Sequence, residues 1–231
     1  MTAHLRLRGD VAVLVPAAGM GVRLGPGGPK ALRTLGGEPL LVHAVRRLAA
    51  AECVGCLVVA APPDAVDAVR VLLAPVAPVT VVAGGATRQA SVRAALDAVP
   101  GAFDIVLVHD AARALAPPAL VDRIAAAIRA GERAVVPVLP VVDTIKQVGD
   151  DGCVVATVDR AVLRSVQTPQ GFRRDVLVAA HQAAVDDLTD DAGLAEKIGV
   201  PVATVAGDEA ALKITRPFDL AIAEALLARS G

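Results

Sequence analysis

The chain has 231 residues, of which 55% are hydrophobic and 20% charged, with 23 Lys and Arg against 24 Asp and Glu. This near balance excludes a globally basic surface that would steer the protein to nucleic acid or to an anionic membrane. The chain has three Phe and no Trp or Tyr, so it offers no aromatic platform for bases, and backbone groups should read any bound base.

The first predicted element is an apolar strand that begins at Val11 and ends in a glycine-rich loop running to Lys30. An unbroken apolar run is typical of a strand buried on both faces. Asp10 and Pro16 leave it too short for a secretory signal, and no other apolar run reaches the roughly 18 residues of a membrane helix. We therefore expect a soluble, cytoplasmic protein.

The loop after this strand has the composition of a polyphosphate site. Its glycines let backbone N–H groups approach phosphate oxygens, and Arg23 and Lys30 add full positive charge. Lys30 follows Pro29 and precedes Ala31, which excludes a Walker A loop, and Leu24 stands where a dinucleotide-binding loop needs its third glycine. The loop favours a nucleotide triphosphate, while a plain strand-to-helix connection with incidental basic residues stays open.

Helices and strands then alternate along the chain. The hydrophobic periodicity predicts helices over 39–51, 64–74, 88–99 and 119–130, and strands over 56–61, 79–83, 104–109 and 133–139. Cys53 and Cys56 lead into the second strand, and a zinc site would need two more ligands nearby. We expect these cysteines, with Cys153, to be reduced residues of a cytosolic protein.

The rhythm changes over residues 140–168, where two strand-like runs flank a turn at 149–152. This pattern predicts a β-hairpin arm instead of a strand and a crossover helix. Lys146, Arg160 and Arg164 are more cations than an idle edge hairpin needs, although an edge without a role stays an alternative.

The last predicted elements are helices over 173–185, 190–198 and 216–228, with a strand over 202–205. No linker-like stretch divides the chain, so we predict a single domain over 1–231. The alternation predicts an α/β protein with a mostly parallel, doubly wound, Rossmann-like sheet and helices on both faces.

Ligands of such sheets bind beyond the carboxyl ends of the strands, and polar groups gather there in this sequence. Asp110 follows a buried strand, and a single carboxylate of this kind suits Mg²⁺, which completes its coordination with phosphate oxygens and water. A cap of a loop or helix is the alternative role. His109 is a structural neighbour of Asp110 in this interpretation, not an acid or base.

Seven motifs in order carry a resemblance to a known family over nearly the whole chain. They are PAAGMGVRLGPGGPK (16–30), GGATRQASV (84–92), HDAAR (109–113), DTIK (143–146), VDR with VQTPQGF (158–172), TDDAG (189–193) and LKITRPFDL (212–220). In these motifs the chain resembles the 2-C-methyl-D-erythritol 4-phosphate cytidylyltransferases. The resemblance implies a nucleotidyltransferase that couples CTP to methylerythritol phosphate in the non-mevalonate route to isoprenoids.

The resemblance also implies roles for individual positions. Arg23 and Lys30 match the pair that neutralises the triphosphate, and Asp110 matches the Mg²⁺ ligand. The positions that match CTP-holding residues are Ala17, Ala18, Gly19, Gly85, Ser91, Asp110 and Ala111. Those that match residues binding or orienting methylerythritol phosphate are Arg113, Thr144, Arg160, Thr168, Thr189 and Lys213, with Arg160 and Lys213 aimed at its phosphate.

In the family the hairpin reaches across a homodimer and completes the partner's site, so the resemblance implies a homodimer with shared active sites. The chain departs from common family residues at Ala86, Ala114 and Gly193. It ends just past its last predicted helix, so we expect a monofunctional enzyme without an appended cyclase domain. A cytidylyltransferase for another polyol phosphate such as ribitol 5-phosphate, a non-catalytic CTP-binding module and an NAD-dependent oxidoreductase are the competing hypotheses.

Overall fold

The sheet is built around β1 (Val11–Pro16), whose residues from Val11 to Val15 are fully buried. The computed structural model describes residues 7–21, 24, 28–186 and 188–229. β4 (Val54–Ala61) and β6 (Ile105–Val108) pair with β1 in parallel on its two sides, and β5 (Thr80–Ala83) pairs in parallel with β4. β1, β4 and β6 are apolar runs of the sequence, and their burial inside the sheet explains that composition. β5 lies at the edge of the sheet, and of its four residues Val81 is the buried one.

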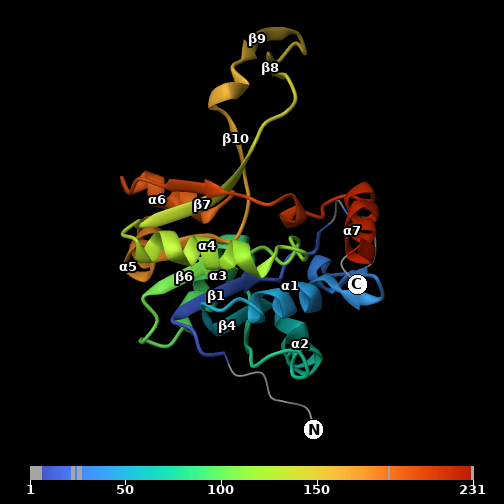
Figure 1. The fold of residues 1–231 in the computed structure, drawn as a ribbon, viewed down its shortest axis with the longest axis vertical. Coiled ribbons are helices and arrows are strands. Elements are labelled where there is room, and N and C mark those ends of the chain that lie inside the picture. The colour runs from blue at the N-terminus through green and yellow to red at the C-terminus, as the bar shows by residue number, and fades with distance from the viewer. Residues whose placement is uncertain (1–6, 22–23, 25–27, 187, 230–231) are drawn as a thin grey trace.

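Helices cover both faces of this sheet (Figure 1). α1 (Leu40–Ala49), α2 (Val66–Leu73) and α4 (Pro118–Arg129) share one core with Val11, Val13 and Val15 of β1. α3 (Arg88–Asp97), α5 (Arg174–Ala183) and α6 (Asp191–Lys197) share a second core with Ala12 and Leu14. Alternate residues of β1 thus face opposite cores, as the two-residue period of a strand requires.

A smaller cluster lies beside the first loop. α7 (Pro217–Arg229) contributes Ala223 to it, packed with Leu35 of β2 (Thr34–Leu35) and with Leu40. β2 pairs with β3 (Glu38–Pro39) as a short antiparallel ladder. Short 3₁₀ turns occur at Lys30–Leu32, Pro63–Ala65, Arg160–Val162 and Glu209–Ala211.

The doubly wound α/β prediction is confirmed, and the structure adds to the main sheet two antiparallel strands that the periodicity did not predict. β11 (Gln170–Arg173) lies antiparallel between β6 and β7 (Ala134–Pro140), and β10 (Arg164–Val166) also runs antiparallel to β7. β12 (Ala203–Ala206) pairs with β7 in parallel. The run from β10 to β11 lacks a strand signature because it is rich in polar residues and is interrupted by Pro169.

The hairpin is the feature that departs from the body of the molecule. β8 (Ile145–Val148) and β9 (Val154–Val158) form their own two-stranded sheet, which projects away from the main sheet in Figure 1. We call residues 141–163 the arm. Several valines on the arm are exposed to solvent: Val142, Val148, Val154, Val155 and Val162. Within the described ranges, no helix has the length and apolar character needed to cross a membrane.

Candidate active site

A cavity of about 300 Å³ opens beyond the carboxyl ends of β1, β5 and β6. We call it the strand-end cavity. Its lining comes from the loops that follow these three strands and from one distant lysine: Pro16–Gly19, Gly21, Lys30, Ala31, Gly85–Arg88, Ser91, Asp110–Ala112 and Lys213. The position at the strand ends is the one expected for the ligand site of an open α/β sheet.

The first loop folds back so that Lys30 reaches this cavity. The backbone N–H of Lys30 donates to the carbonyl of Gly19 at 3.1 Å, which closes the loop. Gly21 has φ of +64°, and a Cβ there would lie 2.3 Å from the Cβ of Lys30, so only glycine fits. Arg23, the second predicted cation of this loop, lies outside the described residues.

The second loop supplies a wall made mostly of backbone. Ser91 Oγ accepts from the backbone N–H of Gly85 at 3.1 Å and donates to the carbonyl of Thr87 at 2.9 Å. A Cβ on Gly84 would lie 2.6 Å from the Cβ of Ala18, so the two loops approach closely only because that position is glycine. A wall without rings fits the expectation that backbone groups would read a bound base.

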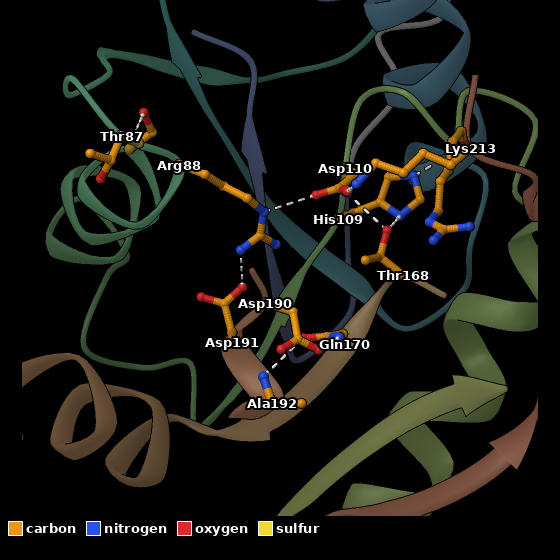
Figure 2. A network of polar contacts seen from close by, with 12 residues as sticks. Thr87, Arg88, His109, Asp110, Thr168, Gln170, Asp190, Asp191, Ala192 and Lys213 are labelled. Atoms are coloured by element: carbon orange, nitrogen blue, oxygen red, sulfur yellow. Dashed lines mark hydrogen bonds and ion pairs between the residues drawn. The ribbon is translucent and has the colours of Figure 1, made fainter. Parts of the chain in front are cut away.

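Asp110 lines the cavity and lies between two cations, Arg88 and Lys213 (Figure 2). Its Oδ1 lies 3.1 Å from Arg88 Nε and its Oδ2 lies 2.7 Å from Lys213 Nζ. Burial by itself raises the pKa of this carboxyl, but the charges of Arg88 and Lys213 outweigh burial and hold the pKa of Asp110 well below its usual range. Asp110 is therefore a carboxylate at any physiological pH.

A buried hydrogen-bonded layer supports Asp110 from behind. Thr168 Oγ1 accepts from the backbone N–H of Asp110 at 3.0 Å and lies 3.2 Å from His109 Nδ1. Burial lowers the pKa of His109 to about 4, so its ring is neutral at pH 7. Its Nε2 lies 3.3 Å from the carbonyl of Arg113, and the ring therefore bridges two structural partners.

Arg113 fixes the segment that carries Lys213. Its guanidinium donates to the carbonyl of Ala211 at 2.7 Å and to the carbonyl of Val166 at 3.1 Å. The Nε of Arg113 is buried, and no group in the described part of the chain accepts its hydrogen. A second tie comes from Gln167, whose amide exchanges hydrogen bonds of 2.8 and 2.9 Å with the backbone of Asp208.

Arg88 and Asp191 are members of the site that the sequence analysis did not single out. Arg88 Nη1 lies 2.8 Å from Asp191 Oδ2, and Asp191 Oδ1 lies 2.9 Å from His181 Nε2. Burial disfavours the charge of Arg88, but Asp191 and Asp110 raise the pKa of its guanidinium above the usual value. Both residues sit inside quoted motifs, GGATRQASV and TDDAG, so the signal that could have found them was a charged residue at the start of a predicted helix.

The predicted residues fall into two groups in space. Those that line the strand-end cavity are Ala17, Ala18, Gly19, Lys30, Gly85, Ser91, Asp110, Ala111 and Lys213, while Arg113 and Thr168 lie buried behind Asp110. Thr144 and Arg160 belong to the arm and are exposed, and Thr189 is exposed just before α6. Arg160 donates to the carbonyl of Val142 within the arm, so this chain does not direct it into its own cavity.

The donor set fits Mg²⁺ only if a ligand brings oxygens of its own. In the described residues, no cluster of three or more His, Cys, Asp or Glu side chains could hold a metal. Asp110 is the carboxylate on the cavity wall, and Mg²⁺ typically takes one or two carboxylates, several waters and phosphate oxygens. The residues present therefore suit a cation that arrives with a polyphosphate.

Comparison with known proteins gives one consistent result. A family model described as 2-C-methyl-D-erythritol 4-phosphate cytidylyltransferase matches residues 11–229. Proteins of that name from Saccharopolyspora erythraea and Frankia casuarinae are each 58% identical, covering 95% of this chain and 100% and 82% of their own lengths.

Solved structures agree with the sequence relatives. The crystal structure of the cytidylyltransferase of that name from Thermus thermophilus is 40% identical, covers 95% of this chain and 99% of its own, and has a TM-score of 0.77. The structure of 4-diphosphocytidyl-2C-methyl-D-erythritol synthase from Anaerococcus prevotii has a TM-score of 0.83 at 26% identity, covering 96% and 99%.

Proposed function

This chain belongs to the 2-C-methyl-D-erythritol 4-phosphate cytidylyltransferase family, and we propose that the strand-end cavity is its active site. The reaction transfers CMP from CTP to 2-C-methyl-D-erythritol 4-phosphate in isoprenoid biosynthesis. The observation that carries the proposal is the convergence of Lys30, Asp110 and Lys213 on one cavity. Two cations and one carboxylate at the end of a parallel sheet match the charge pattern of a triphosphate with its metal.

The nucleotide end of the cavity is the loop wall. We assign the cytidine to the backbone around Ala17–Gly19, Gly85 and Ser91, with Ala111 nearby, because these groups line one cavity and lack bulky side chains. Lys30, together with Arg23 of the same loop, is assigned to the phosphates. These residues offset the charge that develops as pyrophosphate leaves.

Asp110 is the residue we assign to Mg²⁺. When bound, the cation would offset phosphate charge and help to hold the attacking and leaving oxygens in line. Lys213 contacts the Oδ2 of Asp110 at 2.7 Å in the structure, and a cation on that oxygen would release Lys213 towards the phosphate of the second substrate. Arg113, Thr168 and Thr189 are the other residues we assign to methylerythritol phosphate.

The chemistry needs no general base. A phosphate monoester has a second pKa near 6, so methylerythritol phosphate is largely dianionic at neutral pH. One of its oxygens forms a bond to the α-phosphorus of CTP, the bond from that phosphorus to the bridging oxygen breaks, and pyrophosphate leaves with the electron pair. Burial lowers the pKa of His109 to about 4, so its buried ring is a weak base at neutral pH. This agrees with the scheme, in which no side chain has to remove a proton from the attacking phosphate.

We also propose a homodimer in which the arm completes the partner's site. Exposed valines on a projecting two-stranded hairpin need a surface to cover them, since an isolated hairpin is marginally stable. Thr144 and Arg160 lie on this arm and do not line the cavity of their own chain. A partner's cavity is the place where both could act. The cytoplasmic location expected from the sequence stays a prediction.

A pyrophosphate-release assay tests the function. Purified protein with CTP and Mg²⁺ should release pyrophosphate rapidly with methylerythritol phosphate and slowly or not at all with ribitol 5-phosphate, erythritol 4-phosphate or no acceptor. Preference for ribitol 5-phosphate would point to the competing polyol specificity. CTP binding without pyrophosphate release from any acceptor would indicate the non-catalytic module.

A further inference from the structure

Asp191 lies outside the strand-end cavity yet connects to it through Arg88 (Figure 2). Five ionisable groups form one line: His181, Asp191, Arg88, Asp110 and Lys213. The side chains of His181 and Asp191 are each 1% exposed, so this end of the line is closed to solvent. Lys213, at the other end, is 41% exposed and faces the cavity.

Arg88 divides its guanidinium between two carboxylates. Its Nε donates to the Oδ1 of Asp110 at 3.1 Å, and its Nη1 donates to the Oδ2 of Asp191 at 2.8 Å. A guanidinium and a carboxylate left to themselves commonly form two parallel hydrogen bonds, because the two forks match. The contact with Asp191 anchors the guanidinium through Nη1, and Arg88 contacts Asp110 through Nε alone. The other oxygen of Asp110, Oδ2, lies on the cavity side, where it contacts Lys213 at 2.7 Å.

Asp191 can hold Arg88 because it is itself fixed. His181 Nε2 contacts its Oδ1 at 2.9 Å, and the backbone N–H of the next residue, Ala192, donates to Gln170 Oε1 at 3.1 Å. A buried carboxylate also requires a charged partner, and Arg88 is the cation that reaches it. The position of Arg88 is therefore set from the side remote from the substrates.

We propose that Asp191 is a positioning residue that restrains Arg88 and so keeps it from the Oδ2 of Asp110. That oxygen, which contacts Lys213 in this structure, is then left for the divalent cation that accompanies CTP to take from the lysine. This inference rests on the proposed role of Asp110 as the metal ligand. Without Asp191, Arg88 would turn onto Asp110 with two hydrogen bonds and compete with the cation. The effect should appear in metal-dependent nucleotide binding before any chemistry takes place.

The test measures the dissociation constant of CTP by titration calorimetry, with Mg²⁺ and with EDTA, in the absence of methylerythritol phosphate. We call the ratio of the EDTA value to the Mg²⁺ value the Mg²⁺ advantage. D191N keeps the shape of the side chain and leaves one oxygen to accept from His181, but its amide N–H₂ faces the N–H of Arg88. D191N should lower the Mg²⁺ advantage by about 10- to 100-fold, as changes in groups that orient metal ligands typically do, and should leave CTP binding in EDTA nearly unchanged.

D190N is the matched control. Asp190 accepts from Gln170 Nε2 at 2.8 Å and from the backbone N–H of Gly193 at 3.2 Å, and within the described part of the chain it forms no hydrogen bond or ion pair with Arg88. It loses the same charge one residue away, and asparagine still caps a helix well. D190N should keep the wild-type Mg²⁺ advantage.

The double variant R88M/D191N tests whether Asp191 acts by restraining Arg88 or only by stabilising the structure around the site. It also covers the case in which D191N alone folds poorly. It removes the competing guanidinium together with its buried partner charge, so the Mg²⁺ advantage should return towards the wild-type value. A Mg²⁺ advantage in D191N equal to wild type, or one that stays lost in R88M/D191N, overturns the inference. Two other results would contradict the proposed metal role of Asp110 instead of the inference about Asp191. One is a wild-type protein that shows no Mg²⁺ advantage, and the other is a D110N variant that keeps the wild-type Mg²⁺ advantage.

Discussion

Two variants that are inactive alone should restore activity when mixed, if each active site draws on both subunits. Lys30 lines the strand-end cavity of its own chain, whereas Arg160 lies on the projecting arm. In a mixed dimer of Lys30→Ala and Arg160→Ala, one site carries both defects and the other carries neither. Random exchange makes half of the dimers mixed with one intact site in each, so activity should recover to about a quarter of wild type.

The assay follows pyrophosphate release after subunit exchange between differently tagged proteins, with mixed dimers confirmed by native mass spectrometry. Lys30→Ala mixed with the double variant Lys30→Ala/Arg160→Ala serves as the control, because every site then lacks Lys30 and activity should stay at the background. If mixed dimers form but activity remains at the level of the separate variants, Arg160 serves its own subunit and the shared-site proposal is wrong. A monomeric mass for the wild-type protein contradicts it as well.

Three further predictions concern single residues. Lys30→Ala should lower turnover by about two to three powers of ten, because it removes a positive charge that stabilises the transition state. Lys197→Ala, which removes an exposed lysine on α6, should leave turnover unchanged. Equal turnover in the two variants refutes the role of Lys30. Asp110→Asn should remove most activity and flatten its Mg²⁺ titration, since a neutral amide is a poor ligand for a hard cation; an unaltered titration contradicts the metal assignment. Burial lowers the pKa of His109 to about 4 in the folded protein, whereas a histidine in the unfolded chain has a pKa near 6.5. Between about pH 4 and 6.5 the unfolded chain therefore binds more protons than the folded protein, and the free energy of unfolding should rise with pH. His109→Asn should reduce that rise by up to about 2 kcal/mol between pH 4.5 and pH 7 in urea unfolding. An unchanged rise shows that His109 does not contribute.

Local sequence patterns were sufficient for the central sheet. β1, β4 and β6 are continuous apolar runs, and such runs have few alternatives to burial between two helical layers. The arm was predictable for the opposite reason, because alternating residues around a Gly-Asp-Asp-Gly turn suit a solvated hairpin. β10 and β11 could not be predicted in this way, since long-range pairing with β6 and β7 stabilises a run that has weak strand propensity of its own.

The same distinction applies to the site. Lys30 and Asp110 stand in the loops that follow apolar strands, where topology alone brings residues to one edge of the sheet. Arg88 and Asp191 are 103 positions apart, and each begins a helix, where a charge most often faces solvent. Only the fold shows that the partly buried Arg88 meets the buried Asp191, so local sequence could not assign them.

A crystal structure of the protein with CTP and Mg²⁺ tests most directly whether the strand-end cavity is the active site. We expect the triphosphate within hydrogen-bond distance of Lys30, the cytosine against the backbone of Ala17–Gly19 and Gly85, and the cation in contact with Asp110. A nucleotide bound outside this cavity, or a cation held without Asp110, would contradict the assignment.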